Sequence, residues 1–454
     1  MRIAIIGAGW NGCHLAIELT KAGHAVTVLE KQQSIFSGCS GQFGIRLHRG
    51  PHYPRSKATR ESCHLSFERF CQEYSELVNF HEHSIYARAE RDAEGFPSKV
   101  SEESFQAVCF ESEGCQEVDL EDTVHQDLTA AYELDEPSVA VGAELRHFFE
   151  KRLADTRVEM LLDTEVTNIR RRPYGPLMVF FKVKRNNGHT DTKFVDADLV
   201  INATGYQSLT PNALGTSRPL GFDVVYQPCI AFCYEDSSPG AKPISFIVMD
   251  GWFPCLMPSI DHGQAGNPSL RTHNNSTEHH LAGNLQRNYI LTHGSYTILG
   301  SFPKPEQAQT LLNQLSQQLT VTGRIRKLVE DEMCRFWPGF EHRFHYRGWQ
   351  GSVLAKLQTR QEFRSSVVFE KDRVIYVFPG KISNIFSACE EVTTLIAAAQ
   401  GEEGLVDQDA NSFCYAKQVQ LHETDWDASK APEEDDRSTC NLQTYQHFEE
   451  LTGE

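Results

Sequence analysis

The chain has 454 residues, which is too long for one simple core, so its length predicts two or three domains or one cofactor-binding fold with an insertion. Hydrophobic residues make up 40% of the sequence, enough for a sizeable interior, and this excludes wholesale disorder. The net charge of −18 disfavours a nucleic-acid binder and a protein attracted to an anionic membrane surface. Much of the acidity lies near the end, and we expect residues 411–454 to form an acidic C-terminal tail.

The cysteine pattern and the start of the chain bear on the compartment. The 13 cysteines are scattered and form no CxxC pair, which predicts reduced thiols in a cytoplasmic protein and no metal site. A strand expected from residue 2 leaves no room for a signal peptide. No apolar run approaches the ~18 residues of a membrane span, so we expect no membrane partner.

The first thirty residues follow the order strand, glycine turn, helix, strand. The apolar run at residues 2–6 predicts a buried parallel strand. Apolar spacing at residues 13–22 predicts a helix that ends at Gly23. A second apolar run at residues 25–29 predicts another strand, so the segment reads as the start of an α/β unit.

The turn between the first strand and the helix has the pattern GxGxxG. Gly7 permits a tight turn, Gly9 lets the backbone approach a pyrophosphate, and Gly12 lets helix and strand pack closely. The helix N-terminus offers N–H groups to the phosphates. Glu30, after the second strand, is placed to accept hydrogen bonds from a ribose diol. These residues predict a site for a dinucleotide, FAD or NAD.

Three later segments favour FAD. Residues 34–44 are rich in Ser and Gly, as suits a loop that wraps closely around a long cofactor and offers hydroxyl groups to it. Residues 144–169 predict a helix followed by strands, and residues 198–205 predict a buried strand that ends in a glycine turn. No second GxGxxG follows a strand, which disfavours enzymes with two dinucleotide modules.

These blocks resemble a known family. The spacing GxGxxGxxxAxxLxxxGxxVxVxE up to Glu30 resembles the FAD-binding start of the D-amino-acid-oxidase and glycine-oxidase class. Residues 37–41 resemble the flavin-side loop of that class, residues 138–205 its second FAD-binding stretch, and residues 378–386 its closing flavin segment, although with fewer glycines. The resemblance implies FAD as cofactor, held by Gly7, Gly9, Gly12, Glu30, Lys31, Ser37, Ser40, Val166 (through its backbone, to the adenine), Gly205, Gly380 and Ile382.

The expected architecture is α/β: a Rossmann-like FAD-binding domain with an inserted antiparallel β-sheet substrate (cap) domain. Short β-rich runs separated by turn residues, between positions 224 and 302, predict the antiparallel sheet. We expect a discontinuous FAD-binding domain at residues 1–85, 138–212 and 362–410, and the cap at residues 86–137 and 213–361.

A basic and aromatic segment at residues 45–55 follows the Ser/Gly-rich loop, so we expect it to pass near the flavin ring. Arginine binds anions in a bidentate manner, and histidine exchanges protons near neutral pH. A solvated loop, or a covalent flavin link through one of the histidines, are the alternatives. The segment supplies the candidate catalytic residues Arg46, His48 and His52 and the candidate substrate-binding residues Arg49 and Tyr53.

A second aromatic segment at residues 336–349 offers Arg343 and Tyr346 as substrate-binding candidates, although aromatic density of this kind also suits a core. Lys381 follows the Gly380 turn, and we expect it to polarise the flavin or to bind dioxygen; the alternative is an ordinary surface lysine.

The sequence therefore predicts an amino-acid-oxidase-like flavoenzyme. We expect it to oxidise a C–N or C–O bond of a small polar, anionic substrate by hydride transfer to flavin, with dioxygen or another electron acceptor. One alternative is a sugar-nucleotide mutase, because residues 48–52 resemble the Gly-Pro-His segment near the flavin of that class. Others are a single-module flavin monooxygenase and a non-enzymatic nucleotide-binding protein.

Overall fold

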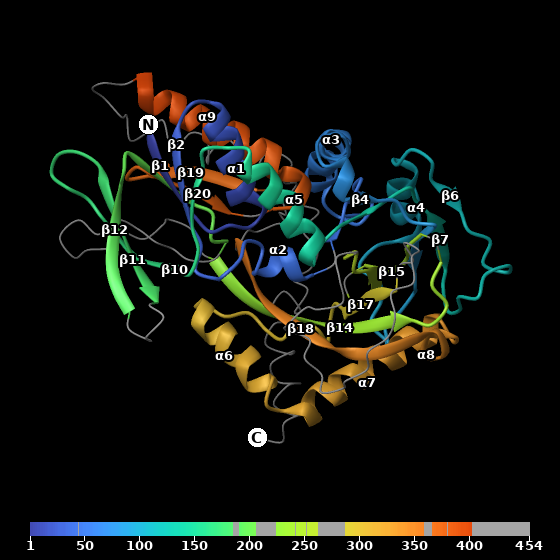
Figure 1. Ribbon diagram of the computed structural model, residues 1–454. Coiled ribbons are helices and arrows are strands. Elements are labelled where there is room, and N and C mark those ends of the chain that lie inside the picture. The colour runs from blue at the N-terminus through green and yellow to red at the C-terminus, as the bar shows by residue number, and fades with distance from the viewer. Residues whose placement is uncertain are drawn as a thin grey trace, which may run out of the picture. The chain divides into compact units, whose positions relative to one another are not determined.

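The computed structural model describes residues 1–43, 45–184, 190–205, 224–240, 242–250, 252–261, 287–357, 366–378 and 380–401 (Figure 1). The chain forms two compact units, called unit 1 and unit 2 below. Unit 1 takes its described residues from Met1–Gly41, Arg146–Val224 and Ala355–Glu434. Unit 2 takes its described residues from Gln42–Leu145 and Val225–Leu354.

Unit 1 is built on a six-stranded sheet with the order β19-β20-β13-β1-β2-β9. All neighbouring strands are parallel except β19 and β20. In a central parallel strand both faces are covered, which is why β1 reads as a continuous apolar run. The strands are β1 (Arg2–Ile6), β2 (Ala25–Leu29), β9 (Glu159–Leu161), β13 (Leu199–Asn202), β19 (Val367–Lys371) and β20 (Val374–Phe378).

Helices and a small sheet complete unit 1. Helix α1 (Trp10–Lys21) contacts α9 (Ile385–Gly401), and the His14 and Phe386 rings meet edge to face with centroids 5.4 Å apart. An antiparallel sheet consists of β10 (Thr164–Arg170), β11 (Leu177–Lys184) and β12 (Thr190–Ala197). Helix α5 (Gly142–Ala154) begins in unit 2 and ends in unit 1.

Unit 2 contains an eight-stranded sheet with the order β18-β14-β17-β16-β15-β5-β7-β6. The pairs β14–β17, β17–β16, β16–β15, β5–β7 and β7–β6 are antiparallel, whereas β15 and β5 pair parallel. The strands are β5 (His83–Arg88), β6 (Gln116–Glu117), β7 (Ala130–Glu133), β14 (Val224–Asp236), β15 (Ile244–Met249), β16 (Pro254–Pro258), β17 (Asn288–His293) and β18 (Phe344–Leu357).

A second sheet of unit 2 has the order β3-β8-β4, with both pairs antiparallel. Its strands are β3 (Ile45–Arg46), β4 (Val78–Asn79) and β8 (Ser138–Val139). The helices are α2 (Cys39–Gln42, shared with unit 1), α3 (Lys57–Glu73), α4 (Glu102–Phe110), α6 (Pro305–Leu315), α7 (Leu319–Phe336) and α8 (Phe340–Arg343), with 3-10 turns η1 (Ser75–Leu77) and, in unit 1, η3 (Ile382–Asn384).

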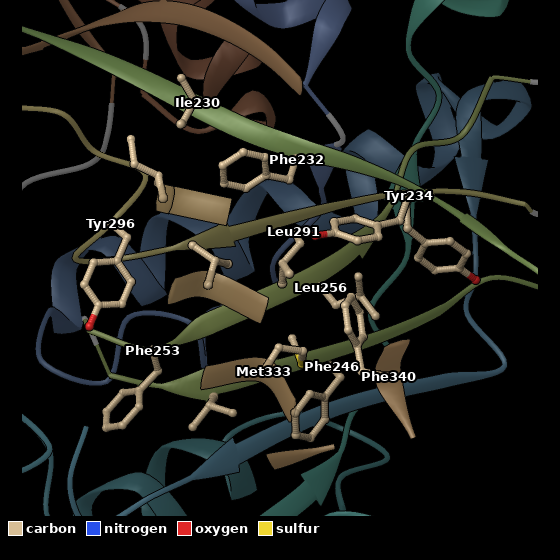
Figure 2. Packing of buried hydrophobic residues seen from close by; sticks show 14 of the residues in the cluster. Ile230, Phe232, Tyr234, Phe246, Phe253, Leu256, Leu291, Tyr296, Met333 and Phe340 are labelled. Carbon is tan, nitrogen blue, oxygen red and sulfur yellow. The ribbon is translucent and has the colours of Figure 1, made fainter. Parts of the chain in front are cut away.

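The large sheet of unit 2 is covered on both faces. Alternate residues of a strand point to opposite faces. On one face Phe246, Leu256 and Leu291 pack with Met333 of α7 in a large hydrophobic cluster (Figure 2). On the other face Tyr86 belongs to a second cluster that includes residues of α4. The core of unit 2 thus fixes both faces of β5, the strand that carries Tyr86.

The division of the chain differs from the expected boundaries in one long stretch and at a few residues beside other boundaries, at 138–145, 224 and 355–357. Residues 42–85, expected in the FAD-binding domain, belong to unit 2. The reason is strand pairing, because β3 and β4 pair with β8, and β5 pairs with β7 and β15. The parallel β5–β15 pair also interrupts the expected antiparallel cap, since its two strands come from distant parts of the chain.

Three further sequence predictions concern the acidic tail, the cysteines and membrane-spanning segments. The acidic tail at residues 411–454 lies outside the described residues. Among the residues described, every cysteine is a free thiol, and none of the helices has the length and apolar character needed to span a membrane.

Candidate functional site

The turn after β1 can only be built from glycines at two of its positions. Gly7 has a φ of +97°, in the region that favours glycine, and a Cβ there would lie 2.9 Å from the Ala203 carbonyl oxygen. A Cβ on Gly12 would lie 1.9 Å from the Gly7 carbonyl oxygen. Backbone therefore approaches backbone on both sides of this turn, and it lies at the carboxyl ends of β1 and β13, where open α/β sheets bind their ligands.

The N–H groups of the first turn of α1 point toward the glycine turn after β1. The helix begins at Trp10, and its N-cap is Gly9, so no side chain caps the helix. An uncapped helix N-terminus carries partial positive charge and binds phosphate through backbone N–H groups. The turn and the helix together have the form of a pyrophosphate cradle.

Glu30 is held beside this cradle. Its carboxylate accepts hydrogen bonds from the backbone N–H of Ala8, at 2.8 Å, and from that of Gln32, at 2.9 Å. A carboxylate has about four acceptor positions, so it retains capacity for the two hydroxyl groups of a ribose. The position and chemistry of Glu30 fit the adenosine ribose of a dinucleotide.

The Ser/Gly-rich loop folds against the turn within unit 1. The Phe36 N–H donates to the Ala8 carbonyl oxygen at 2.9 Å, and the Ser37 hydroxyl donates to the Ser34 carbonyl oxygen at 2.7 Å. The Ser40 Oγ would lie 3.1 Å from a Cβ on Gly9. Ser40 therefore lies close to Gly9, and Ser37 follows Phe36, which is bonded to the turn; their contacts with FAD stay predictions.

Three further cofactor candidates lie on other elements of unit 1. Gly205 follows β13 and has a φ of +78°, which suits the glycine turn expected there. Val166 is buried on β10, at an irregularity in the register with β11. Lys31 is exposed just beyond β2. Their contacts with FAD stay predictions.

The segment before α9 forms a compact turn. The Gly380 N–H donates to Ser366 Oγ at 3.1 Å, and the Lys381 N–H donates to Asn384 Oδ1 at 2.9 Å. Ile382 begins η3, which leads directly into α9. Burial lowers the pKa of Lys381 to about 8, so this amine exchanges its proton much closer to neutral pH than an exposed lysine does.

Unit 2 contains a buried charge cluster, defined here as Arg46, His48, Ser84, Tyr86 and Glu136. Arg46 Nε donates to Glu136 Oε2 at 3.0 Å, and both side chains have 0% exposure. Arg46 Nη2 also donates to Ser84 Oγ. A buried charge is tolerated only when it is paired and hydrogen-bonded, so each of these two ionic groups requires the other.

Tyr86 and His48 extend the cluster. The Tyr86 hydroxyl donates to Glu136 Oε2 at 2.7 Å, and His48 Nδ1 lies 3.1 Å from the same hydroxyl oxygen. Burial alone would raise the pKa of Glu136, but its contact with His48 and the positive charge of Arg46 outweigh this effect and bring that pKa to about 2. The Glu136 carboxylate is therefore ionised at neutral pH.

Two further predicted residues pack around His48. The rings of His48 and His52 are stacked, with centroids 4.3 Å apart, and Tyr53 meets both edge to face. The Arg49 backbone N–H donates to Glu136 Oε1 at 2.7 Å. The structure thus brings Arg46, His48 and Arg49 to the Glu136 carboxylate, and His52 and Tyr53 pack on the His48 ring.

Arg46 has one guanidinium nitrogen that no hydrogen-bond acceptor reaches in the described part of the chain. Arg46 is 4% exposed, and its Nη1 is buried without a hydrogen-bond acceptor among the described residues. A buried guanidinium nitrogen that lacks an acceptor costs free energy, so a ligand oxygen at this position would be favourable.

Arg343 and Tyr346 take structural positions. Arg343 holds the Asp236 carboxylate through Nε and Nη2, the shortest distance being 2.7 Å, and Asp236 is fully buried. Tyr346 packs on Tyr234, with ring centroids 5.9 Å apart. Their role as substrate ligands stays a prediction, and the contacts support the alternative of a packed core.

Sequence reasoning did not identify Glu136, Tyr86 or Ser84. Glu136 lies in an acidic stretch between β7 and β8, and Ser84 and Tyr86 are alternate residues of β5. Nothing in the local sequence marks them, because their shared feature is a tertiary contact with the arginine of β3.

Comparisons with known proteins agree with this geometry. A family model described as FAD dependent oxidoreductase, DAO, matches residues 2–251. The FAD-dependent monooxygenase kojA of Aspergillus flavus is 47% identical over 454 residues, covering 98% of this chain and 97% of that protein. The FAD-dependent monooxygenase FPY4 of Fusarium mangiferae is 25% identical over 394 residues, covering 87% of this chain and 90% of that protein.

Solved structures share the fold at low identity. Glycine oxidase from Geobacillus kaustophilus has a TM-score of 0.57 and 15% identity, with 89% of this chain and 96% of that chain covered. L-proline dehydrogenase from P. horikoshii has a TM-score of 0.56 and 15% identity, with 87% and 93% covered. The expected α/β fold class is confirmed by these structures.

Proposed function

Because the chain belongs to the DAO family of FAD dependent oxidoreductases, we propose that it oxidises a C–N or C–O bond of a small polar, anionic substrate. FAD is its cofactor, and the glycine cradle and Glu30 fit that group. When bound, FAD supplies the two-electron redox chemistry that amino-acid side chains lack. The proposal assigns FAD binding to unit 1 and the substrate-binding groups to unit 2.

The observation that carries the substrate assignment is the unpartnered nitrogen of Arg46. Two of the three guanidinium nitrogens are engaged, by Glu136 and Ser84, and Nη1 has no acceptor among the described residues. A carboxylate or another oxygen-bearing group of the substrate would supply that acceptor, in a charge-assisted hydrogen bond.

A base is needed when an ammonium group or an alcohol is oxidised, because the nitrogen must lose a proton to free its lone pair before hydride leaves the adjacent carbon, and the oxygen must lose its proton as hydride leaves. We assign this role to His48, since imidazole is the side chain that most readily accepts a proton near neutral pH. Glu136 lies 3.5 Å from His48 Nδ1, so its negative charge stabilises the imidazolium that forms.

The test is anaerobic mixing of the purified holoenzyme with pools of small carboxylic acids, amines and sugars, followed by the flavin absorbance. Bleaching by one pool identifies a substrate. Arg46→Lys keeps the positive charge beside Glu136 but removes the planar donor, so we expect flavin reduction to fall at least tenfold with FAD content unchanged. Reduction at the wild-type rate would overturn the assignment of Arg46.

A second candidate function is a flavin monooxygenase, favoured by the 47% identity to a protein of that name. Such an enzyme would leave the flavin unbleached by substrate alone. It would consume NADPH or NADH faster when substrate is present, and one oxygen atom from ¹⁸O₂ would enter the product.

A further inference from the structure

We propose that Glu136 and Tyr86 are positioning residues that hold His48 in the tautomer with hydrogen on Nδ1, so that Nε2 is the nitrogen that accepts the substrate proton. This inference rests on the proposed function, in which His48 is the base. It adds two residues and names the reacting atom. The step is a proton transfer: the substrate N–H or O–H bond breaks and a bond from hydrogen to Nε2 forms, with no change in electron count.

The first step of the argument concerns Glu136. Its oxygens receive hydrogen bonds from Arg46 Nε at 3.0 Å, from the Tyr86 hydroxyl at 2.7 Å and from the Arg49 N–H at 2.7 Å. Each of these partners brings a hydrogen to the carboxylate. An ionised carboxylate has no hydrogen of its own, so Glu136 acts only as an acceptor.

The second step concerns Tyr86. A phenol has one hydrogen, and burial raises the pKa of Tyr86 well above its usual range, so that hydrogen stays on the oxygen. Glu136 Oε2 is the ionised acceptor and lies at the shorter distance, 2.7 Å against 3.1 Å for His48 Nδ1. Charge-assisted O–H···O⁻ bonds are the stronger kind, so the hydrogen points to Glu136.

The third step follows for His48. With its only hydrogen directed at Glu136, the Tyr86 oxygen can only accept a hydrogen bond from His48 Nδ1. His48 Nδ1 must therefore carry a hydrogen, and in the neutral ring the lone pair that accepts protons lies on Nε2. The ring that bears it is 9% exposed and is stacked on His52, which restricts its rotation.

The charges around His48 favour a temporary gain of one proton. Among the described residues, the groups with a contact given to His48 are Glu136, Tyr86, His52 and Tyr53, and Arg46 lies beyond the carboxylate. Glu136 is the negative charge among them and touches the Nδ1 side of the ring. Loss of this charge would make protonation of His48 harder, and its titration midpoint would move to lower pH.

The chain offers a matched control for this network. Tyr234 is also a buried tyrosine that donates to a buried glutamate, Glu330, at 2.8 Å. It lies on β14 of the same sheet, and its hydroxyl contacts no member of the charge cluster in the hydrogen bonds described. Tyr234→Phe therefore removes the same chemistry from a place without His48.

The test is ¹⁵N NMR of holoenzyme labelled at histidine, with the His48 signals identified by their loss in His48→Gln. We expect hydrogen on Nδ1 in the wild type. In Glu136→Gln, hydrogen should move in part to Nε2, and the midpoint of His48 should fall by about one pH unit, because a neighbouring charge shifts such a midpoint by that order. Tyr234→Phe should change neither property.

Hydrogen on Nε2 in the wild type, or an unchanged tautomer and midpoint in Glu136→Gln, would overturn the inference. If Glu136→Gln fails to retain FAD, Tyr86→Phe takes its place, and the expected result is a loss of the single Nδ1–H population. These measurements need no substrate. A negative result here with normal flavin bleaching would remove the positioning role alone, whereas absence of bleaching with every pool would remove the proposed oxidation.

Discussion

The glycine turn after β1 in unit 1 and the buried charge cluster of unit 2 are built in opposite ways. The turn uses residues close in sequence, Gly7 to Gly12, and its geometry depends on the absence of side chains. The cluster joins Arg46, Ser84 and Glu136 from three distant segments, and it depends on side chains that satisfy each other. The difference teaches that the glycine turn is specified by consecutive residues, whereas the candidate substrate site is a property of tertiary structure.

The largest effect is expected from a substitution that disrupts the glycine turn. Gly12→Val places a Cβ 1.9 Å from the Gly7 carbonyl oxygen, and backbone cannot yield at that distance, so we expect FAD content to fall more than tenfold. The measurement is the ratio of flavin to protein absorbance after purification. Gly38→Ala is the control, because a Cβ there meets nothing within 4 Å, and it should retain full FAD content.

The next largest effect is expected when Glu136 is removed from the buried charge cluster. Glu136→Ala leaves the Arg46 charge buried without its partner, and removal of one member of such a pair costs about 3–5 kcal/mol of unfolding free energy. Chemical denaturation of the holoprotein measures it. In the control Glu68→Ala, the lost partner of Arg49 is mostly exposed, so the cost should stay below about 1 kcal/mol. Equal losses in the two variants would contradict the buried pairing.

The pH dependence of the unfolding free energy tests the same buried pairing of Glu136 with Arg46. The pKa of Glu136 is lowered from 4.5 to about 2, so its stabilising contribution is fully present above pH 4.5 and is lost as the pH falls toward 2. We expect the wild type to lose stability across that window more steeply than Glu136→Gln. Denaturation curves at several pH values would show it, and parallel curves would refute it.

A smaller effect is expected at Glu30. Glu30→Gln keeps an acceptor for the Ala8 N–H but removes the negative charge that we propose accepts hydrogen bonds from the ribose hydroxyls, so FAD affinity should fall about tenfold, or about 1.4 kcal/mol. Fluorescence titration of the apoprotein with FAD gives the dissociation constant. The exposed Glu18, paired with Lys21 on α1, is the control, and Glu18→Gln should bind FAD normally.

The smallest effect is expected at Lys381. Burial lowers its pKa to about 8 from 10.5, so the folded state is disfavoured below pH 8 and gains stability as the pH rises from 8 to 10.5. Lys381→Met should remove this rise, a change on the order of 1 kcal/mol after allowance for partial exposure. Thermal denaturation between pH 7 and 10 measures it, and an unchanged slope would contradict the low pKa.

The amino-acid sequence by itself determined the glycine turn and the acid beside it, to which we assign FAD binding. Gly7, Gly12 and Glu30 were predicted because their roles arise from backbone geometry and from short spacing, both of which are written in consecutive residues. The resemblance to the D-amino-acid-oxidase class, carried by the same residues, is confirmed by the family match. The histidines and arginines of residues 46–53 were also predicted, but only as a group.

Tertiary structure decided which groups those residues contact. It placed Glu136 and Tyr86 beside His48, and it turned Arg343 toward Asp236. It also assigned residues 42–85 to unit 2, because β5 pairs with strands from distant parts of the chain. Such contacts depend on which strands become neighbours in a sheet, and long-range pairing leaves no periodic mark in the local sequence.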